Sequence, residues 1–302
     1  TWSPASDYLG DLSVASGASL LFDRVQGLAL LVGGTIDLIT FDLSDGQTVD
    51  VPSTPISLAT LDKGRWVVDG NTTSAPDGVY ALSGQNAIFN PISNQLVTHG
   101  GAGTHIFEPT LRRWSTSDDM VQSELYGADF VYDSEREGLI AIAPPTMFEF
   151  SPTLDPDALH WSPFTPNGPS PEPRQGHALA YDQGRDKVVL FGGDNATSNY
   201  LGTTWEYDGE AWVMMPAPGP ARREHAMAYD ATRGVTVLFG GYNAENHLND
   251  LWEWDGEDWV ERTLEGPRPE PRRGHTLTYD ADWGVTVLFG GLPEGSSHEQ
   301  LP

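Results

Sequence analysis

Short apolar runs alternate with clusters of turn-forming residues along the C-terminal half of the chain. Residues 177–182 (HALAYD) and 187–193 (KVVLFGG) illustrate the pattern, because both are rich in Val, Leu, Ala and aromatic residues and only QGRD lies between them. Runs of this length and composition are typical of consecutive antiparallel strands. No segment carries an apolar stripe with the period of about 3.6 residues that marks a helix, so we expect almost no helix.

The same pattern recurs three times. Residues 174–193 read RQGHALAYDQGRDKVVLFGG, residues 222–241 read RREHAMAYDATRGVTVLFGG, and residues 272–291 read RRGHTLTYDADWGVTVLFGG, which places the three histidines 48 and 50 positions apart. Two spaced aromatic residues follow the first glycine pair in TTWEYDGEAW and the second in LWEWDGEDW. A period near 50 residues indicates one repeated supersecondary unit.

This pattern resembles the kelch repeat, and the resemblance covers about residues 172–291. Fragments of the same unit stand at 22–34, 88–101 and 130–144, and residues 57–70 match a shortened one. The resemblance implies an all-β, kelch-type β-propeller of four-stranded blades, with the aromatic residues packed between neighbouring blades. Counting the glycine pairs and their equivalents predicts seven blades, or six if 57–70 is an insertion.

We expect one propeller domain over residues 1–302. Residues 17–171 would form the divergent blades, and residues 172–302 the regular ones. The last blade is predicted to be incomplete, because only LPEGSSHEQLP follows its glycine pair. That is too short for the two outer strands.

The missing strands need a donor, because an open edge strand is a configuration that proteins avoid. Trp2-Ser3-Pro4 is similar to Trp161-Ser162-Pro163, where an outermost strand is expected. We therefore predict that residues 1–16 pair with the last blade and close the ring. The alternative is that a neighbouring subunit or further sequence supplies the strands.

The direction of the strands predicts where a ligand binds. If the strands of a blade are labelled a to d, the d–a and b–c connections lie at one end of the propeller and the a–b and c–d turns at the other. The first end, here named the loop rim, carries the Arg-x-x-His segments and the loops 194–201 and 242–249. The second end, the turn rim, carries tight turns such as 182–185. Longer loops on a rigid scaffold are the usual place for binding, so we expect the ligand at the loop rim.

The candidate ligand-binding residues are polar residues of the loop rim. For the repeated arginines and histidines we favour a structural role over ligand contact, because identical residues in consecutive blades satisfy the same local geometry each time. Residues that break the symmetry are the better candidates. The whole candidate set is Arg174, His177, Asp194, Asn195, Arg222, His225, Asn243, Glu245, His247, Arg272 and His275.

Metal binding has little support in the sequence. His99 and His105 flank a glycine-rich turn near Glu108, which gives at most three donors where a metal site needs three or four converging ones. The segment 133–138 has some features of a calcium loop but lacks its bidentate Glu, and it aligns with the a–b turns. We expect no cofactor. Asn71 and Asn195 stand in glycosylation sequons, which matter only in a secreted protein.

Composition excludes several classes of protein. The 302 residues include no Cys, so thiolate metal sites, disulfides and cysteine nucleophiles are impossible. With 43 acidic and 16 basic residues, the net charge of −27 argues against nucleic-acid binding. No apolar run is long enough to span a membrane. The missing Cys also removes the cross-linked Tyr–Cys cofactor of galactose-oxidase-like kelch propellers, and no E-x-x-x-D-x-x-x-H set of specifier-like propellers is present.

The sequence leads us to favour a non-enzymatic binding or scaffold propeller that recognises protein or carbohydrate on the loop rim. One alternative is a propeller enzyme that acts on a sugar by acid–base chemistry in the channel, similar to sialic-acid mutarotases. Another is a subunit of an extracellular assembly. An extracellular or cell-surface location is expected from the acidity and the lack of Cys.

Overall fold

The computed structural model describes residues 18–23, 28–33, 39–42, 48–51, 59–62, 65–68, 87–90, 95–100, 103–108, 113–117, 128–151, 160–197, 199–263, 266, 268–281 and 284–294. All regular structure within these residues is β-strand, in agreement with the periodicity of the sequence. The described part of the chain contains no helix long and apolar enough to cross a membrane.

The described strands form six antiparallel sheets and one separate hairpin. The first sheet consists of β1 (Ala18–Asp23), β2 (Leu28–Gly33), β5 (Ala59–Asp62) and β6 (Arg65–Val68). The second sheet consists of β7 (Ala87–Asn90), β8 (Gln95–Gly100), β9 (Gly103–Glu108) and β10 (Arg113–Ser117). The separate hairpin consists of β3 (Ile39–Asp42) and β4 (Thr48–Val51). The third sheet consists of β11 (Asp129–Asp133), β12 (Gly138–Ala143), β13 (Thr146–Ser151) and β14 (His160–Phe164). The fourth sheet consists of β15 (Ala178–Asp182), β16 (Lys187–Phe191), β17 (Thr204–Tyr207) and β18 (Trp212–Met214). The fifth sheet consists of β19 (Ala226–Asp230), β20 (Val235–Tyr242), β21 (His247–Trp254) and β22 (Trp259–Glu261). The described part of the sixth sheet consists of β23 (Arg272–Asp280) and β24 (Val285–Pro293).

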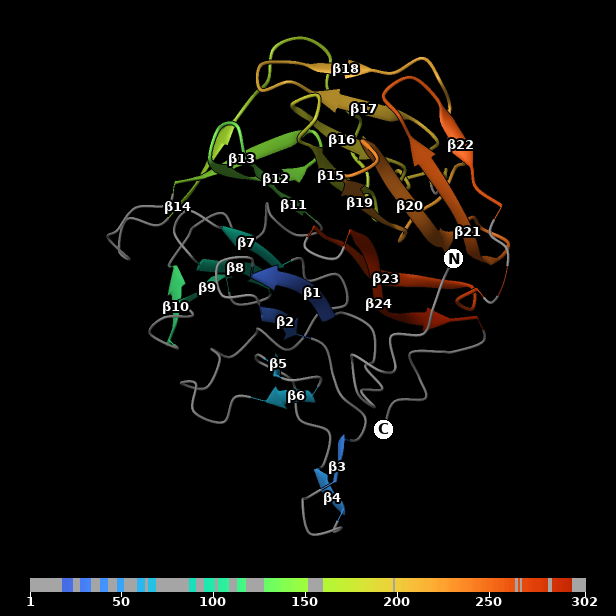
Figure 1. Ribbon diagram of the computed structural model, residues 1–302. Coiled ribbons are helices and arrows are strands. Elements are labelled where there is room, and N and C mark those ends of the chain that lie inside the picture. Colours follow the sequence, from blue (N-terminus) through green and yellow to red (C-terminus); the bar gives the residue numbers. More distant parts are fainter. Residues whose placement is uncertain are drawn as a thin grey trace.

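The sheets are arranged radially, with the first strand of each nearest the centre (Figure 1). These inner strands contact one another in the order β1, β7, β11, β15, β19 and β23, and β23 in turn contacts β1. The ring of inner strands is therefore closed, which is the propeller-like arrangement that the repeat predicts.

The predicted count of seven blades is not confirmed, because the described residues form six sheets. Residues 57–70, counted as a shortened blade, instead contain β5 and β6, the two outer strands of the first sheet. Leu30 and Leu31 of β2 pair with Thr60 and Ala59 of β5. The hairpin β3–β4 is inserted between these paired strands and projects away from the ring (Figure 1).

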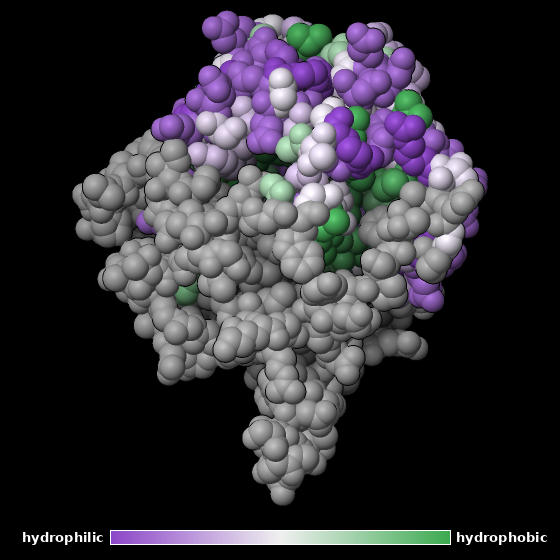
Figure 2. All heavy atoms as spheres, viewed as in Figure 1, coloured by the Kyte–Doolittle hydropathy of each residue, from purple (hydrophilic) through white to green (hydrophobic). Residues whose placement is uncertain are grey.

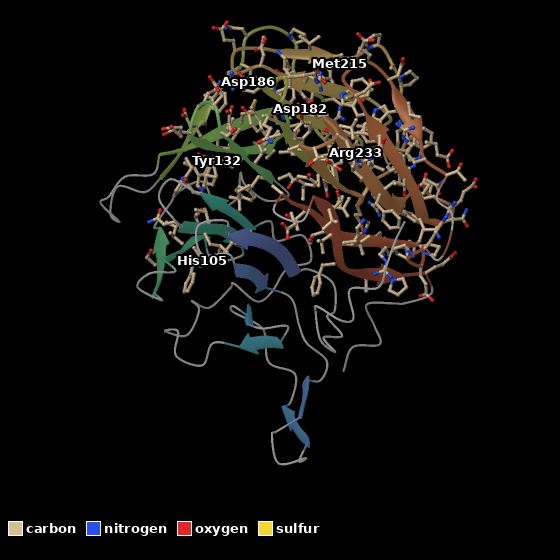
Figure 3. All side chains as sticks on the ribbon, in the orientation of Figure 1. His105, Tyr132, Asp182, Asp186, Met215 and Arg233 are labelled. Carbon is tan, nitrogen blue, oxygen red and sulfur yellow. The ribbon has the colours of Figure 1, made fainter. Side chains whose placement is uncertain are left out.

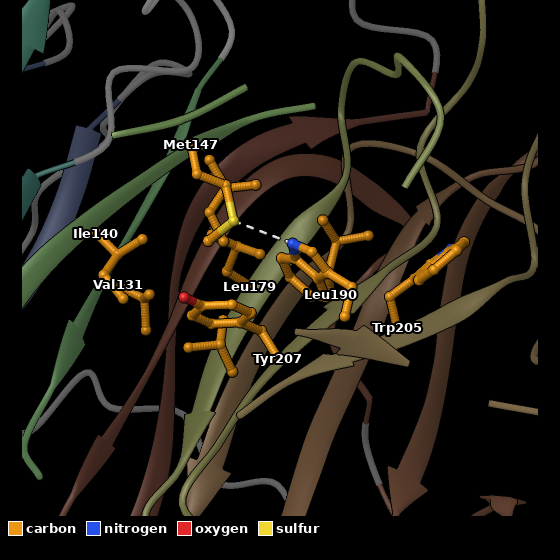
Figure 4. Close-up of a cluster of buried hydrophobic side chains, with 10 residues drawn as sticks. Val131, Ile140, Met147, Leu179, Leu190, Trp205 and Tyr207 are labelled. Carbon is orange, nitrogen blue, oxygen red and sulfur yellow. Dashed lines mark hydrogen bonds between the residues drawn. The ribbon is translucent and has the colours of Figure 1, made fainter. Parts of the chain in front are cut away.

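Neighbouring sheets are joined by buried apolar side chains, as shown for the third and fourth sheets in Figure 4. Met147 of β13 lies in this cluster, and its sulfur accepts a hydrogen bond of 3.0 Å from the indole of Trp212 in the next sheet. The indole of Trp259 makes the equivalent contact one sheet further on, donating to the Thr204 hydroxyl at 2.8 Å. The prediction that the aromatic residues pack between blades is confirmed for these two tryptophans.

The turn rim is held by charged side chains that are already paired. Asp182 accepts from the backbone N–H groups of Gly184 and Arg185 at 3.0 Å each, and from the Arg185 side chain at 2.7 Å. The same guanidinium binds Glu206 through two bonds of 3.0 and 2.7 Å, and Glu206 accepts from the Trp254 indole of the next sheet at 2.8 Å. One carboxylate therefore ties a turn, a strand and the neighbouring blade together.

The Asp–Arg pair of this turn recurs in the adjacent blades. Asp133 binds Arg136 in the third sheet, and Asp230 binds Arg233 in the fifth. Asp182 and Arg233 are labelled in Figure 3. The pairing of Asp133 with a guanidinium supports the prediction that 133–138 is an a–b turn.

The predicted closing segment, residues 1–16, lies outside the described residues. Within the described part of the chain, the last sheet consists of β23 and β24 alone. Closure by the N-terminal segment therefore stays a prediction.

Candidate functional site

The loop rim is a connected surface. Gln175 and Asp194 exchange two backbone hydrogen bonds of 2.9 Å, and Arg223 and Tyr242 exchange two of 3.0 and 2.9 Å. In the fourth and fifth sheets, the segment that leads into strand a therefore lies beside the residues that follow strand b. This is the arrangement that the strand directions predict.

The loop after the second glycine pair is shorter than the range 242–249 expected from the sequence. Strand β20 continues to Tyr242 and β21 begins at His247, so only four residues connect them. Asn243 caps this turn by accepting from the N–H groups of Glu245 and Asn246 at 3.3 and 3.0 Å. Glu245 is exposed at its tip, whereas Asn243 and His247 are half-buried.

The first arginine of each Arg-x-x-His segment binds the glycine pair of its own blade. The guanidinium donates to the carbonyl of the first glycine, in the pairs Arg174–Gly192 at 3.0 Å, Arg222–Gly240 at 2.8 Å and Arg272–Gly290 at 2.9 Å. Burial lowers the pKa of Arg174 to about 10, against the opposing effect of Glu172. Each guanidinium is thus engaged in holding a turn.

The glycine pairs are required for this close approach. Gly193 and Gly241 have φ values of +90° and +99°, in the left-handed region that favours glycine. A Cβ at either position would also lie 2.7 Å from a backbone carbonyl, that of Gln175 or Arg223. A side chain would force the Arg-x-x-His segment away from the strand.

The histidines of the three segments are buried at the blade junctions. His275 shares a hydrogen bond of 3.0 Å with the Phe239 carbonyl of the preceding blade, and its ring meets the Phe239 ring edge-on. His225 meets Phe191 in the same way. Burial lowers the pKa of His177 to about 4 and that of His275 to about 3, against the smaller raising effect of a backbone carbonyl in each case. Both rings are therefore neutral near pH 7.

Guanidinium groups and tyrosine rings alternate across three blades of the loop rim. The Arg223 guanidinium lies 5.8 Å from the Tyr200 ring centroid and 6.0 Å from that of Tyr242. Arg273 lies 5.7 Å from the Tyr242 centroid on the next blade. We name these four residues the Arg–Tyr stack; the distances fall within the range of cation–π attraction.

Two carboxylates hold the Arg–Tyr stack. Asp194 accepts from Arg223 at 3.2 Å, and Glu224 accepts from Arg273 at 3.0 and 3.2 Å. Asp194 was predicted from the sequence as a ligand-binding residue, whereas Glu224, Arg223 and Arg273 were not. The available signal was the position before each histidine, which is Gly, Glu and Gly in the three repeats.

Asn195 forms a compact turn beside this group. Its side-chain oxygen accepts from the Thr197 hydroxyl at 2.7 Å and from two backbone N–H groups, and its amide donates to Glu172 at 3.3 Å. These contacts connect Asn195 to Thr197 and Asn199 through the Asn side chain itself.

The two weak metal candidates belong to adjacent strands, His99 to β8 and His105 to β9. In the β8–β9 pairing, His99 is opposite Thr104, whereas His105 is opposite Thr98. Metal binding by these two histidines stays a prediction. No group of three or more potential metal ligands occurs among the described residues.

Asp129 is a further polar residue that was not predicted from the sequence. It begins β11, an inner strand, where the regular repeats have Ala178 and Ala226. Its carboxylate accepts hydrogen bonds from the backbone N–H of Phe130 at 3.0 Å and from the backbone N–H of Leu179, in the next blade, at 2.9 Å. Burial raises the pKa of Asp129 to about 7, against the lowering effect of these hydrogen bonds.

A family model described as the KLHDC2/KLHL20/DRC7 kelch-repeats domain matches residues 147–301, just over half of the 302 residues. The matched range begins in the third sheet and includes all three regular repeats. No curated protein matches the chain.

Proposed function

Because the chain belongs to the kelch-repeat β-propellers, we propose that it is a non-enzymatic binding propeller whose loop rim recognises a protein partner. Kelch propellers commonly mediate protein binding, and the three regular repeats carry the Arg-x-x-His segments of this rim.

The Arg–Tyr stack is the observation that carries the proposal. Arg and Tyr are among the residue types in which the binding energy of protein interfaces concentrates. Here they are half-buried and held by the backbone pairing of Arg223 with Tyr242 and by two carboxylates, Asp194 and Glu224. Side chains fixed in this way lose little freedom when a partner binds, which favours affinity.

The turn rim is less suited to this role, because its repeated arginines bind carboxylates, whereas Arg223 and Arg273 of the loop rim also lie over tyrosine rings. The described part of the surface in Figure 2 is mostly hydrophilic. We infer that the partner is recognised through polar and aromatic contacts.

The sugar-enzyme alternative requires two or more perturbed acid–base groups that converge in one sector of the channel. Asp129 is one perturbed group, and only backbone N–H groups and burial contribute to its pKa. The buried histidines are distributed one to a blade. The described residues therefore give the binding proposal more support than the enzyme.

Two matched variants of the fifth sheet test the proposal. Glu245 lies at the tip of the loop-rim turn and Glu257 at the turn rim of the same sheet, and both are exposed. A photoreactive amino acid at position 245 should cross-link the partner in the native host, whereas one at position 257 should not. The partner so identified should bind Glu245→Lys about tenfold or more weakly, and Glu257→Lys like the wild type.

A partner that cross-links equally from both positions, or that binds both variants alike, would show that the loop rim is not the binding surface. A glycan array with the same two variants tests carbohydrate recognition: glycan binding lost only in Glu245→Lys would assign the rim to sugars.

A location outside the cell is part of the proposal, and it rests on the acidic composition and the absence of Cys. Recovery of the native protein from the medium or from the surface of intact cells would support it. Recovery from the cytosol alone would overturn it.

A further inference from the structure

The position before each buried histidine breaks the symmetry of the loop rim. Gly176, Glu224 and Gly274 occupy it, and all three have left-handed backbone conformations, with φ values of +62°, +53° and +63°. Glycine adopts this conformation readily, whereas a residue with a side chain is disfavoured there. Glu224 therefore occupies a backbone position that suits glycine, and its side chain distinguishes this repeat from the other two.

The backbone of Glu224 links three blades. Its N–H donates to the Gly176 carbonyl at 2.8 Å, and its own carbonyl accepts from the Gly274 N–H at 2.9 Å. These two bonds connect the three equivalent positions directly. The Glu224 side chain is thereby held at one place on the rim.

That place lies between two guanidinium groups. Both Glu224 oxygens accept from Arg273, at 3.0 and 3.2 Å, and one lies 3.4 Å from Nε of Arg223. Asp194 binds the other side of Arg223 at 3.2 Å. Two positive and two negative charges are therefore balanced within the cluster.

The cluster is open to solvent. The exposed fractions of the Arg223, Glu224 and Arg273 side chains are 31%, 32% and 25%. An anionic group of a partner would reach the same two guanidinium groups if the Glu224 carboxylate were not between them. Half-exposed guanidinium groups without this carboxylate would form a site for a carboxylate of a binding partner.

We infer that Glu224 sets the charge selectivity of the loop rim: its carboxylate takes the position of an external anion between Arg223 and Arg273, so the rim accepts neutral or cationic groups of a partner and not acidic ones. The inference rests on the proposed function, because it specifies the partner chemistry of the same surface. The net charge of −27 acts in the same direction, since it attracts cationic partners at long range.

Replacement of Glu224 by the residue of the two sister repeats tests the inference. Glu224→Gly should bind a fluorescent hexaglutamate peptide about tenfold or more tightly than the wild type does, and added salt should weaken this binding. Glu224→Gln keeps the side chain and removes its charge, so it should show a smaller gain. Fluorescence polarisation measures all three proteins, and circular dichroism checks that they are folded.

Two controls separate Glu224 from a general effect of charge. Glu257→Gln removes one negative charge from an exposed turn of the turn rim, and it should leave hexaglutamate binding unchanged. Adding Arg273→Gln to Glu224→Gly should abolish the gain, because it removes the guanidinium that the carboxylate occupied.

The inference is wrong if Glu224→Gly and Glu224→Gln bind hexaglutamate no more tightly than the wild type does. It is also wrong if Glu257→Gln shows the same gain. Because the probe is a synthetic peptide, this result does not depend on the partner. A partner that cross-links at the turn rim would overturn the proposed function even where the selectivity of Glu224 is observed.

Discussion

At the scale of single residues, burial decides what the repeated histidines do. His177, His225 and His275 are 7%, 5% and 6% exposed, and the imidazoles lie against the preceding blade. The sequence showed that these residues repeat, and repetition alone favoured the structural role. It could not show that the rings are buried at blade junctions, because that depends on how two sheets meet.

The buried histidines should make the fold sensitive to acid. Burial, together with the nearby charge of Arg222, holds the pKa of His225 well below its ordinary value of 6.5, so the folded state keeps the ring neutral while the unfolded chain takes up a proton. The free energy of unfolding should therefore fall as the pH drops below about 6.5, by about 1.4 kcal/mol per pH unit for this residue.

His225→Met removes the titratable imidazole and replaces it with an apolar side chain of similar size. Between pH 6.5 and 5, urea denaturation should show a loss of stability for the variant that is smaller than that of the wild type by about 2 kcal/mol. Parallel losses in the two proteins would mean that His225 does not titrate on unfolding. Asp129 acts in the opposite sense, because its raised pKa of about 7 makes the free energy of unfolding fall as the pH rises from about 4 to 7. Both proteins contain Asp129, so the difference in stability between the variant and the wild type isolates the effect of His225.

At the scale of elements, the strands of the regular repeats could be predicted because their pattern is local. The runs HALAYD, KVVLFGG, TTWEYD and EAWVMM correspond to the four successive strands β15 to β18. The turn at 243–246 was predicted less well. Tyr242 and His247 pair across it, and such cross-strand pairing is not visible in the composition of a polar loop.

The two tryptophans of β21 differ in how much they contribute to the stability of the fold. Trp254 is 0% exposed and its indole donates to Glu206 of the preceding blade at 2.8 Å, whereas Trp252 is half-buried and donates to Asp250 of its own strand. Trp254→Ala should therefore lower the free energy of unfolding by about 3–5 kcal/mol, the usual cost of truncating a buried aromatic side chain.

Urea denaturation of three variants checks this order. Trp252→Ala should cost less than Trp254→Ala, and His247→Ala on the loop rim should cost less than about 1 kcal/mol. Equal costs for Trp254 and His247 would contradict the assignment of Trp254 to the blade junction.

At the scale of the whole molecule, long-range pairing limited what the sequence could show. The repeated half is regular enough to identify the fold, but the number of blades depends on which strands pair across insertions. Residues 57–70 have the composition of a blade centre, yet β5 pairs with β2 across the inserted β3–β4 hairpin. The loop rim followed from strand direction alone, whereas the contacts of Glu224 connect three blades and required the structure.

Closure of the ring gives the last prediction. Five of the six sheets have four strands, while the described part of the last sheet has only β23 and β24. The strand β24 is nine residues long, and an open edge of that length invites pairing with another strand. We predict that residues 1–16 supply a strand to this sheet.

Hydrogen exchange of the β24 amides that are not bonded to β23 tests closure in the full chain, in Trp2→Ala and in a variant that lacks residues 1–16. Exchange should accelerate by about tenfold or more in the shortened variant, because the edge would open more often, and Trp2→Ala should have a smaller effect in the same direction. Unchanged exchange in the shortened variant would show that these residues do not cover β24. If protection of β24 then rose with protein concentration, a strand from a second copy would be the donor, since only pairing between molecules depends on concentration.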